Sequence, residues 1–187
     1  STPYLTAELF DIKFAQSADV MYITHPSHAT RKLSRTGHTA WTLTTVDFTN
    51  GPYLDTNTST TTITASAQTV GTGRTFTASA NTFASTDVGR LIRFRDGHAK
   101  VTGFTDATVV TVEILVDTGS ASASTDWSLG AFSDTTGHPS CVTFFEQRLV
   151  FAATLNNPQT IYFSKSGDYE NMDANIGGTV ADDDAIV

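Results

Sequence analysis

Cysteine is almost absent from this 187-residue sequence, in which Cys141 stands alone. A single cysteine excludes an internal disulfide framework and any zinc site built from several thiolates. The residues that follow it, 142–145 (Val-Thr-Phe-Phe), are typical of a strand. We therefore expect Cys141 to be a small buried apolar residue rather than a nucleophile.

Charged residues are also few, at 16% of the sequence, and the acidic ones outnumber the basic ones to give a net charge of −8. This balance argues against a basic surface that wraps nucleic acid, because such affinity comes from neutralised phosphates. An acidic wall remains compatible with DNA that passes without being bound. No apolar run approaches the ~18 residues of a membrane helix, so we expect no membrane span.

The motifs of common enzyme classes are missing as well. There is no G-x-S-x-G, no P-loop, and no G-x-G-x-x-G where a strand leads into a helix. His25 and His28 flank a Pro-Ser turn, which suits shared metal ligation poorly. Residues 182–184 (Asp-Asp-Asp) lack the spacing of a calcium loop and are expected to form a solvated acidic turn. We predict no catalytic, metal or cofactor-binding residue, no cofactor and no enzyme activity.

What the sequence does contain in quantity is threonine, with 34 residues. The branched Cβ of threonine fits a pleated, half-exposed surface, so this composition predicts an all-β protein. One segment, residues 3–13, predicts a short helix, because Leu5, Leu9 and Ile12 fall on one face at helical spacing.

A strand–turn–strand pattern occurs twice, about 131 residues apart. The first copy is residues 14–26 (Phe-Ala-Gln-Ser-Ala-Asp-Val-Met-Tyr-Ile-Thr-His-Pro), followed by 33–37 (Leu-Ser-Arg-Thr-Gly). The second copy is residues 145–158 (Phe-Glu-Gln-Arg-Leu-Val-Phe-Ala-Ala-Thr-Leu-Asn-Asn-Pro), followed by 163–167 (Phe-Ser-Lys-Ser-Gly). Recurrence of such a unit is typical of radial or stacked β architectures, and short strands in succession form a meander like a propeller blade.

The composition changes between the two copies, and this change sets the expected domains. Residues 1–52 and 131–187 are predicted to form the two parts of a partial β-propeller-like scaffold with meander blades. Residues 53–130 are predicted to be an inserted small β-barrel or sandwich domain, with short strands and a hairpin signal at Asp96-Gly97.

Several stretches of the predicted scaffold resemble one family, the tail nozzle (tail tubular protein B) proteins of short-tailed bacteriophages and prophages. The strongest local match is residues 158–172 (Pro-Gln-Thr-Ile-Tyr-Phe-Ser-Lys-Ser-Gly-Asp-Tyr-Glu-Asn-Met). The other matching stretches are 14–26, 32–35, 41–43, 137–139, 142–151 and the acidic 182–186. None of these motifs is catalytic, and the resemblance fails over residues 53–130.

The resemblance implies a structural virion protein with no catalysis. In this family, the full-length subunit contains a β-propeller and forms a homo-hexameric ring beside an adaptor protein, and DNA leaves the virion through its channel without specific binding. The expected location is the virion tail, after synthesis in the cytoplasm of the bacterial host. It also implies that this chain is part of a longer protein, which agrees with a start at Ser1 without Met.

Two alternatives stay open at this point. The first is a host-surface carbohydrate-binding module on the inserted domain, which requires exposed aromatic side chains to stack on sugars. The second is a polysaccharide-degrading enzyme that uses a carboxylate pair drawn from Asp168, Glu170 and Asp173. The aromatic candidates of the inserted domain are Tyr53, Phe76, Phe83, Phe94, Phe104 and Trp127.

Overall fold

A computed structural model describes residues 2–175 and 178–187 of the chain. The chain forms two compact units, one made of Ser1–Pro52 with Thr136–Val187 and the other of Tyr53–Thr135. The second unit extends to Thr135, whose hydroxyl donates a hydrogen bond to Asp87 of the same unit. No helix among the described residues is long and apolar enough to cross a membrane.

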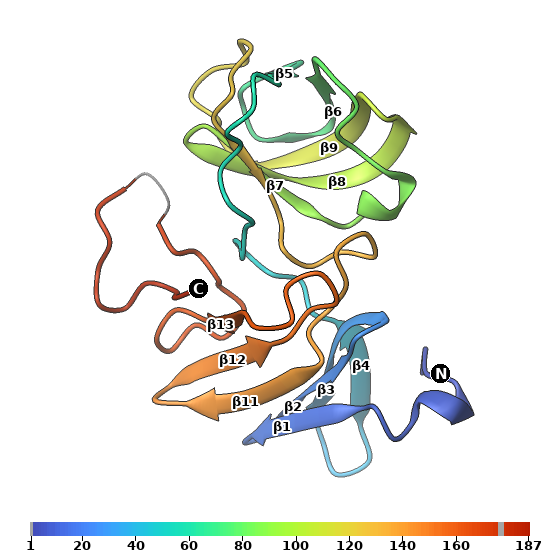
Figure 1. Cartoon of the computed structure of the whole chain (residues 1–187). Coiled ribbons are helices and arrows are strands. Elements are labelled where there is room, and N and C mark those ends of the chain that lie inside the picture. Colours follow the sequence, from blue (N-terminus) through green and yellow to red (C-terminus); the bar gives the residue numbers. More distant parts are fainter. Residues whose placement is uncertain (1, 176–177) are drawn as a thin grey trace. The chain divides into compact units, whose positions relative to one another are not determined.

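The protein is all-β, as predicted, with three antiparallel sheets (Figure 1). The helix expected over residues 3–13 is wrong, since this segment contains one short 3-10 turn, η1 (Thr6–Glu8). None of the η1 residues is buried, and Leu5 and Leu9 are exposed. A short helix depends on the packing of its apolar face, and Leu5 and Leu9 of the expected apolar face remain unpacked. A second 3-10 turn, η2 (Ser85–Asp87), lies in the second unit.

The first sheet is a four-stranded meander in the order β1-β2-β3-β4. Its strands are β1 (Lys13–Ser17), β2 (Val20–His25), β3 (His28–Arg35) and β4 (Trp41–Thr45). The register places Tyr22 of β2 opposite Lys32 of β3, and Leu33 of β3 opposite Leu43 of β4. Consecutive strands pair with each other throughout, which is the blade-like arrangement predicted from the sequence.

The second sheet repeats this meander with β11 (Cys141–Phe145), β12 (Arg148–Ala152) and β13 (Ile161–Phe163). Beyond β13, Ile186 exchanges backbone hydrogen bonds with Phe163 in both directions, so Ile186 takes the place that β4 has beside β3. The first strands of the two meanders, β1 and β11, lie side by side (Figure 1).

The structure contains the repeated meander, but the number of residues that separates equivalent positions of the two copies differs from the number expected from the sequence. Val20 and Arg148, which open the second strand of each meander, lie 128 positions apart, against the expected 131. The two Gln residues at 16 and 147 are therefore not equivalent, because Gln16 lies in β1 and Gln147 lies in a turn. That turn is Glu146-Gln147, both residues having positive φ, and it joins β11 to β12.

Cys141 is exposed, so its predicted burial is wrong. Burial alternates along β11, with Cys141, Thr143 and Phe145 exposed and the residues between them partly buried. The strand-like neighbours indicated a strand correctly, but a strand has two faces, and Cys141 lies on the outward one.

The second unit is a six-stranded sheet in the order β10-β7-β8-β9-β6-β5, and it curls on itself in Figure 1. The strands are β5 (Ile63–Ala65), β6 (Gly71–Ala78), β7 (Leu91–Phe94), β8 (Gly97–Asp106), β9 (Val109–Val116) and β10 (Trp127–Leu129). Register shifts interrupt the β8–β9 and β6–β9 ladders, and such bulges increase local twist and curvature.

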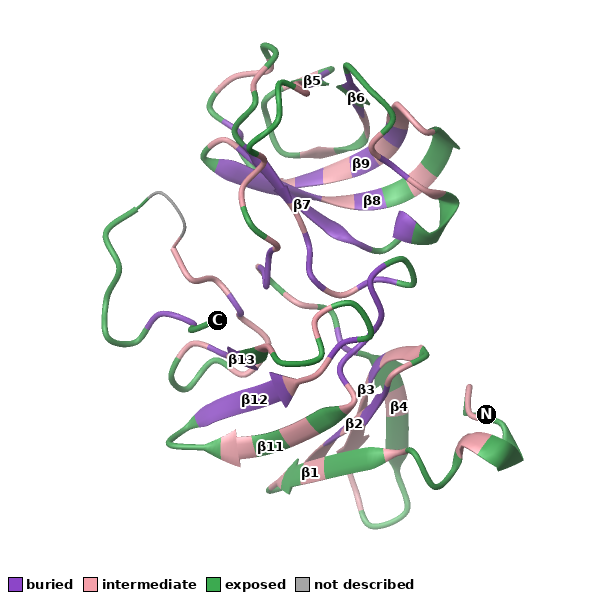
Figure 2. Cartoon of the chain, viewed as in Figure 1, coloured by how far each residue is buried: buried purple, intermediate pink, exposed green. Residues whose placement is uncertain are grey.

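The buried apolar residues of the second unit form one hydrophobic core cluster. Figure 2 shows buried stretches on β7, β8 and β9 of this unit. Phe76, Phe94 and Ile114 are among its fully buried side chains. Phe76 and Phe94 come from β6 and β7, and their rings contact each other with centroids 5.4 Å apart. Alternate residues of strands in one curved sheet converge on a shared interior, so this unit has a core of its own.

Candidate functional site

The first candidate group of side chains surrounds Glu170, one of the three carboxylates considered above. Tyr22 Oη donates a hydrogen bond to Glu170 Oε1 at 2.9 Å, and Lys32 Nζ forms an ion pair with the same oxygen. Tyr22 and Lys32 are cross-strand partners on β2 and β3, so the sheet register brings the two donors together. The backbone carbonyl of Glu170 also accepts the amide of Thr49.

The electrostatics of this group follow from burial and from the charge of Glu170. Burial raises the pKa of Tyr22 above its ordinary value, and the hydrogen bond to Glu170 raises it further. Tyr22 therefore remains a neutral donor to a charged acceptor, which is a strong type of hydrogen bond. The contacts hold the loop around Glu170 against the first meander.

The other two candidates for the carboxylate pair, Asp168 and Asp173, have different neighbours from each other. Asp168 is close enough to Tyr22 to raise its pKa, so Asp168 and Glu170 share one neighbourhood. Asp173 instead influences Lys165 electrostatically and accepts the backbone amide of Asn175 at 2.9 Å.

His25 and His28 face each other at the end of the β2–β3 hairpin, with ring centroids 4.9 Å apart. His28 Nε2 lies 2.9 Å from Glu8 Oε2, and His25 Nδ1 accepts the amide of Ser27. Tyr4 packs its ring against both histidines. Within residues 2–175 and 178–187, no group of three or more His, Cys, Asp or Glu side chains is arranged to hold a metal ion.

The acidic run at 182–184 is only partly the solvated turn that was expected. Asp184 is buried, and its carboxylate accepts Lys165 Nζ at 2.7 Å and the amide of Ala181 at 2.8 Å. The contact with Lys165 and the amide of Ala181 lower the pKa of Asp184. The expectation fails for Asp184 because Lys165, its ion-pair partner, comes from another segment of the chain, which the local sequence does not reveal.

Arg148 organises the same segment from the start of β12, and the sequence contains no motif that indicates this role. Its Nη1 donates to the carbonyl oxygens of Ser164 at 2.7 Å and Asp184 at 2.6 Å, while Nη2 donates to that of Asp182 at 2.6 Å. The guanidinium fork presents several donors in one plane, so one side chain gathers carbonyls from two segments.

The aromatic side chains of the second unit are mostly unavailable for stacking on a sugar. Phe104 is 38% exposed, whereas the other five candidates are buried in the unit. Trp127 also uses its indole N–H within the unit, donating to the carbonyl of Thr61 at 3.0 Å. The buried five are Tyr53, Phe76, Phe83, Phe94 and Trp127.

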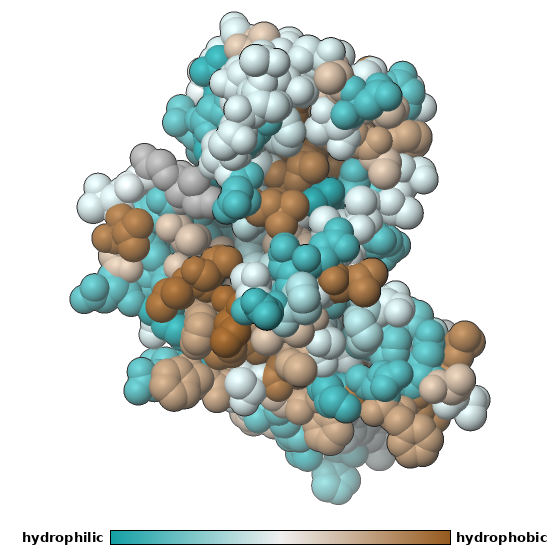
Figure 3. Space-filling view, in the orientation of Figure 1, coloured by the Kyte–Doolittle hydropathy of each residue, from teal (hydrophilic) through white to brown (hydrophobic). Residues whose placement is uncertain are grey.

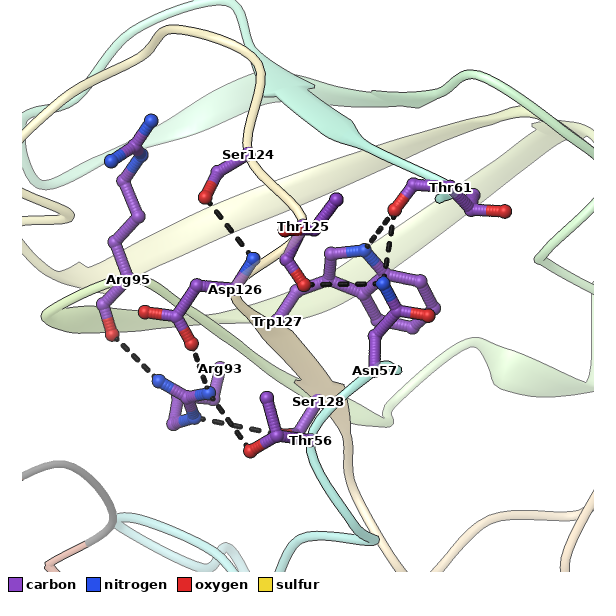
Figure 4. A network of polar contacts seen from close by, with 10 residues as sticks. All are labelled: Thr56, Asn57, Thr61, Arg93, Arg95, Ser124, Thr125, Asp126, Trp127 and Ser128. Carbon is purple, nitrogen blue, oxygen red and sulfur yellow. Dashed lines mark hydrogen bonds and ion pairs between the residues drawn. The ribbon is translucent and has the colours of Figure 1, made fainter. Parts of the chain in front are cut away.

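A polar network ties the first and last segments of the second unit together (Figure 4). Asn57 Nδ2 donates to the carbonyls of Thr61 and Thr125, and Arg93 Nη2 contacts Asp126 Oδ1 at 2.5 Å and Thr56 Oγ1 at 3.3 Å. These bonds join residues near 56–61 to residues near 125–128. The network therefore holds the first and last segments of the second unit next to each other.

The two units differ in how much apolar surface they expose. Figure 3 shows apolar side chains at the surface of the first unit on the face in view. Phe10 is 91% exposed in this unit, and several other large apolar side chains accompany it. A surface that exposes many large apolar side chains is typical of contacts with other proteins. Those of residues 2–52 and 136–161 are Leu5, Leu9, Phe10, Phe14, Trp41, Phe145, Leu155 and Ile161.

No model of a known protein family matches the sequence, and no curated protein matches it either.

Proposed function

We propose that this chain is a structural subunit of a phage tail, of the nozzle type, in which a β-propeller-like scaffold carries an inserted β-unit. The observation that carries the proposal is the repeated meander of the first unit, with β1 and β11 side by side. Propeller blades are meanders repeated around an axis, so two neighbouring meanders match the architecture that the sequence resemblance implies.

Two further observations support an assembly role. The first unit exposes large apolar side chains, among them Phe10 and Phe14, which suit contacts with other subunits. The net charge of −8 suits a channel wall past which DNA moves, because an acidic surface does not retain phosphates. In this proposal the partners are further copies in a ring, an adaptor protein, and DNA in transit.

The burial of five candidate aromatics weakens the alternative of a carbohydrate-binding module. A stacking platform requires exposed ring faces, and of the six rings Phe104 alone is exposed.

Electron microscopy of the full-length protein, with particle averaging, tests the proposal. We expect a six-fold ring with a central channel wide enough for duplex DNA. Discrete monomers or trimers without a channel would contradict it. A glycan-binding screen on the same preparation addresses the alternative, and we expect no binding.

A further inference from the structure

The outer edge of β4 is an open backbone edge with a defined set of unpaired groups. The amide of Thr36 donates to the carbonyl of Ala40, and the amide of Val46 donates to the carbonyl of Thr30. Both pairs belong to the β3–β4 register, in which hydrogen-bonded and non-bonded pairs alternate along an antiparallel ladder. Thr42 and Thr44 therefore direct their backbone groups at β3. The backbone amides and carbonyls of Trp41, Leu43 and Thr45 point away from β3.

Every other sheet end in the described part of the chain has a neighbour. Ser124 exchanges backbone hydrogen bonds with Ile63 of β5, and Leu54 donates to Leu129 of β10. Ile186 pairs with β13, while β1 and β11 lie beside each other. In residues 2–175 and 178–187, no backbone pairing joins β1 and β11, but each covers the outer edge of the other, whereas the strand that β4 substantially contacts is its ladder partner β3.

β4 also lacks the devices by which proteins usually protect an exposed edge. Its sequence, Trp-Thr-Leu-Thr-Thr, contains no proline and no charged residue, and its ladder with β3 has no register shift. Trp41 is 56% exposed. A flat, uncharged, exposed edge strand is a template for pairing with another strand.

We propose that β4 pairs antiparallel with β4 of a second copy of this chain, about a two-fold axis at Leu43. The outward groups lie symmetrically around Leu43, so this register places Leu43 opposite Leu43 and Trp41 opposite Thr45 of the second copy. All outward amides and carbonyls then find partners. Because β4 is uncharged, two copies of an acidic chain meet here without direct repulsion between charges. This contact goes beyond the proposed function and does not depend on it.

Disulfide mapping tests the register directly. Residues opposite each other in a hydrogen-bonded antiparallel pair have Cα atoms about 5.5 Å apart, which a disulfide can span. In a Cys141→Ser background, Leu43→Cys is expected to cross-link with itself under mild oxidation. Thr45→Cys alone is expected not to cross-link, whereas a mixture of Trp41→Cys and Thr45→Cys chains should give mixed dimers. Cross-linking of Thr45→Cys alone as efficient as that of Leu43→Cys would overturn the register.

Light scattering of the unmodified chain at increasing concentration provides the second measurement. We expect a concentration-dependent dimer, weakened at least about tenfold by Leu43→Pro, which removes an outward N–H and spares the ladder with β3. Thr44→Pro is the control, because it removes an inward bond and should destabilise the sheet itself. A strictly monomeric chain, or a dimer that Leu43→Pro leaves unchanged, overturns the proposal. If Leu43→Pro does not fold, the cysteine series decides by itself.

Discussion

Tyr22 and Glu170 are separated by 148 positions in the sequence, and their side chains are joined by a 2.9 Å hydrogen bond in the first unit. The two residues come from the two parts of the chain that the second unit separates. Their contact, together with the ion pair from Lys32, fastens the loop of one part to the meander of the other.

Removing this hydrogen bond is expected to destabilise the first unit. Tyr22→Phe keeps the ring that packs on Phe144 but removes the hydroxyl, and should lower the free energy of unfolding by about 1–3 kcal/mol. Urea unfolding of Tyr22→Phe, Glu170→Gln and the double variant measures the coupling. The two effects should be less than additive, and full additivity would show that the bond contributes nothing.

The raised pKa of Tyr22 predicts a loss of stability in alkali. In the unfolded chain Tyr22 ionises near pH 10, whereas in the folded protein burial and Glu170 keep it protonated to higher pH. Above pH 10 the unfolded state therefore binds fewer protons, and stability falls as the pH rises from the unfolded pKa towards the folded one. Urea midpoints measured from pH 8 upward should fall less steeply for Tyr22→Phe than for the unmodified chain. Equal slopes would contradict the assignment.

Arg148 is expected to hold the segment around Ile186 in place. Arg148→Met leaves the carbonyls of Ser164, Asp182 and Asp184 without their buried donor and should destabilise the unit by about 2–4 kcal/mol. Hydrogen exchange should show loss of protection at the amides of Phe163 and Ile186, which pair with each other.

Arg35→Met is the matched control for this change, because Arg35 lies at the surface with a long contact of 3.5 Å to Asp19. Its effect should stay below about 1 kcal/mol. Unchanged protection at Ile186 in Arg148→Met would contradict the role given to Arg148.

The buried ion pair of Asp87 and Arg90 is expected to stabilise the second unit against unfolding. Asp87 accepts Arg90 Nη1 at 2.8 Å, the amide of Ala84 and the hydroxyl of Thr135. Asp87→Asn leaves the buried Arg90 cation without its charge partner, which costs about 3–5 kcal/mol. Fluorescence of Trp127 in a Trp41→Phe background reports unfolding of this unit alone. Asp19→Asn, which breaks the exposed pair, should have little effect on the same signal.

The second unit is expected to fold by itself. Its core is formed within residues 53–135, and the network of Asn57 and Arg93 joins its two ends. A 53–135 fragment should unfold cooperatively in a thermal melt followed by circular dichroism. Phe76→Ala should cost about 3–5 kcal/mol and Phe104→Ala distinctly less, because Phe76 is fully buried and Phe104 is partly exposed. A fragment without a cooperative transition would contradict this prediction.

Hairpins were predictable from the sequence because turn chemistry is local. The strand–turn–strand pattern that begins at residue 145 corresponds to a hairpin, with the turn Glu146-Gln147 between β11 and β12. The hairpin signalled by Asp96-Gly97 also exists, but Arg95 and Asp96 form its turn and Gly97 pairs with Phe94. Arg95 has the positive φ of 52°, and a Cβ at Gly97 would lie 2.2 Å from the carbonyl oxygen of Val116. The glycine is needed for a close approach to β9, which no local pattern reveals.

The sequence by itself determined the all-β class of the protein and the positions of several of its turns. Threonine-rich alternating segments form strands, turn residues mark most of their ends, and the repeated pattern corresponds to two meanders. These properties depend on neighbours within a few residues, and for that reason the sequence alone predicts them. The tertiary structure alone decided which face each strand buries and which distant groups meet. Cys141 is exposed, Asp184 is buried against Lys165, and Tyr22 finds Glu170, because burial and pairing depend on segments that only folding brings together.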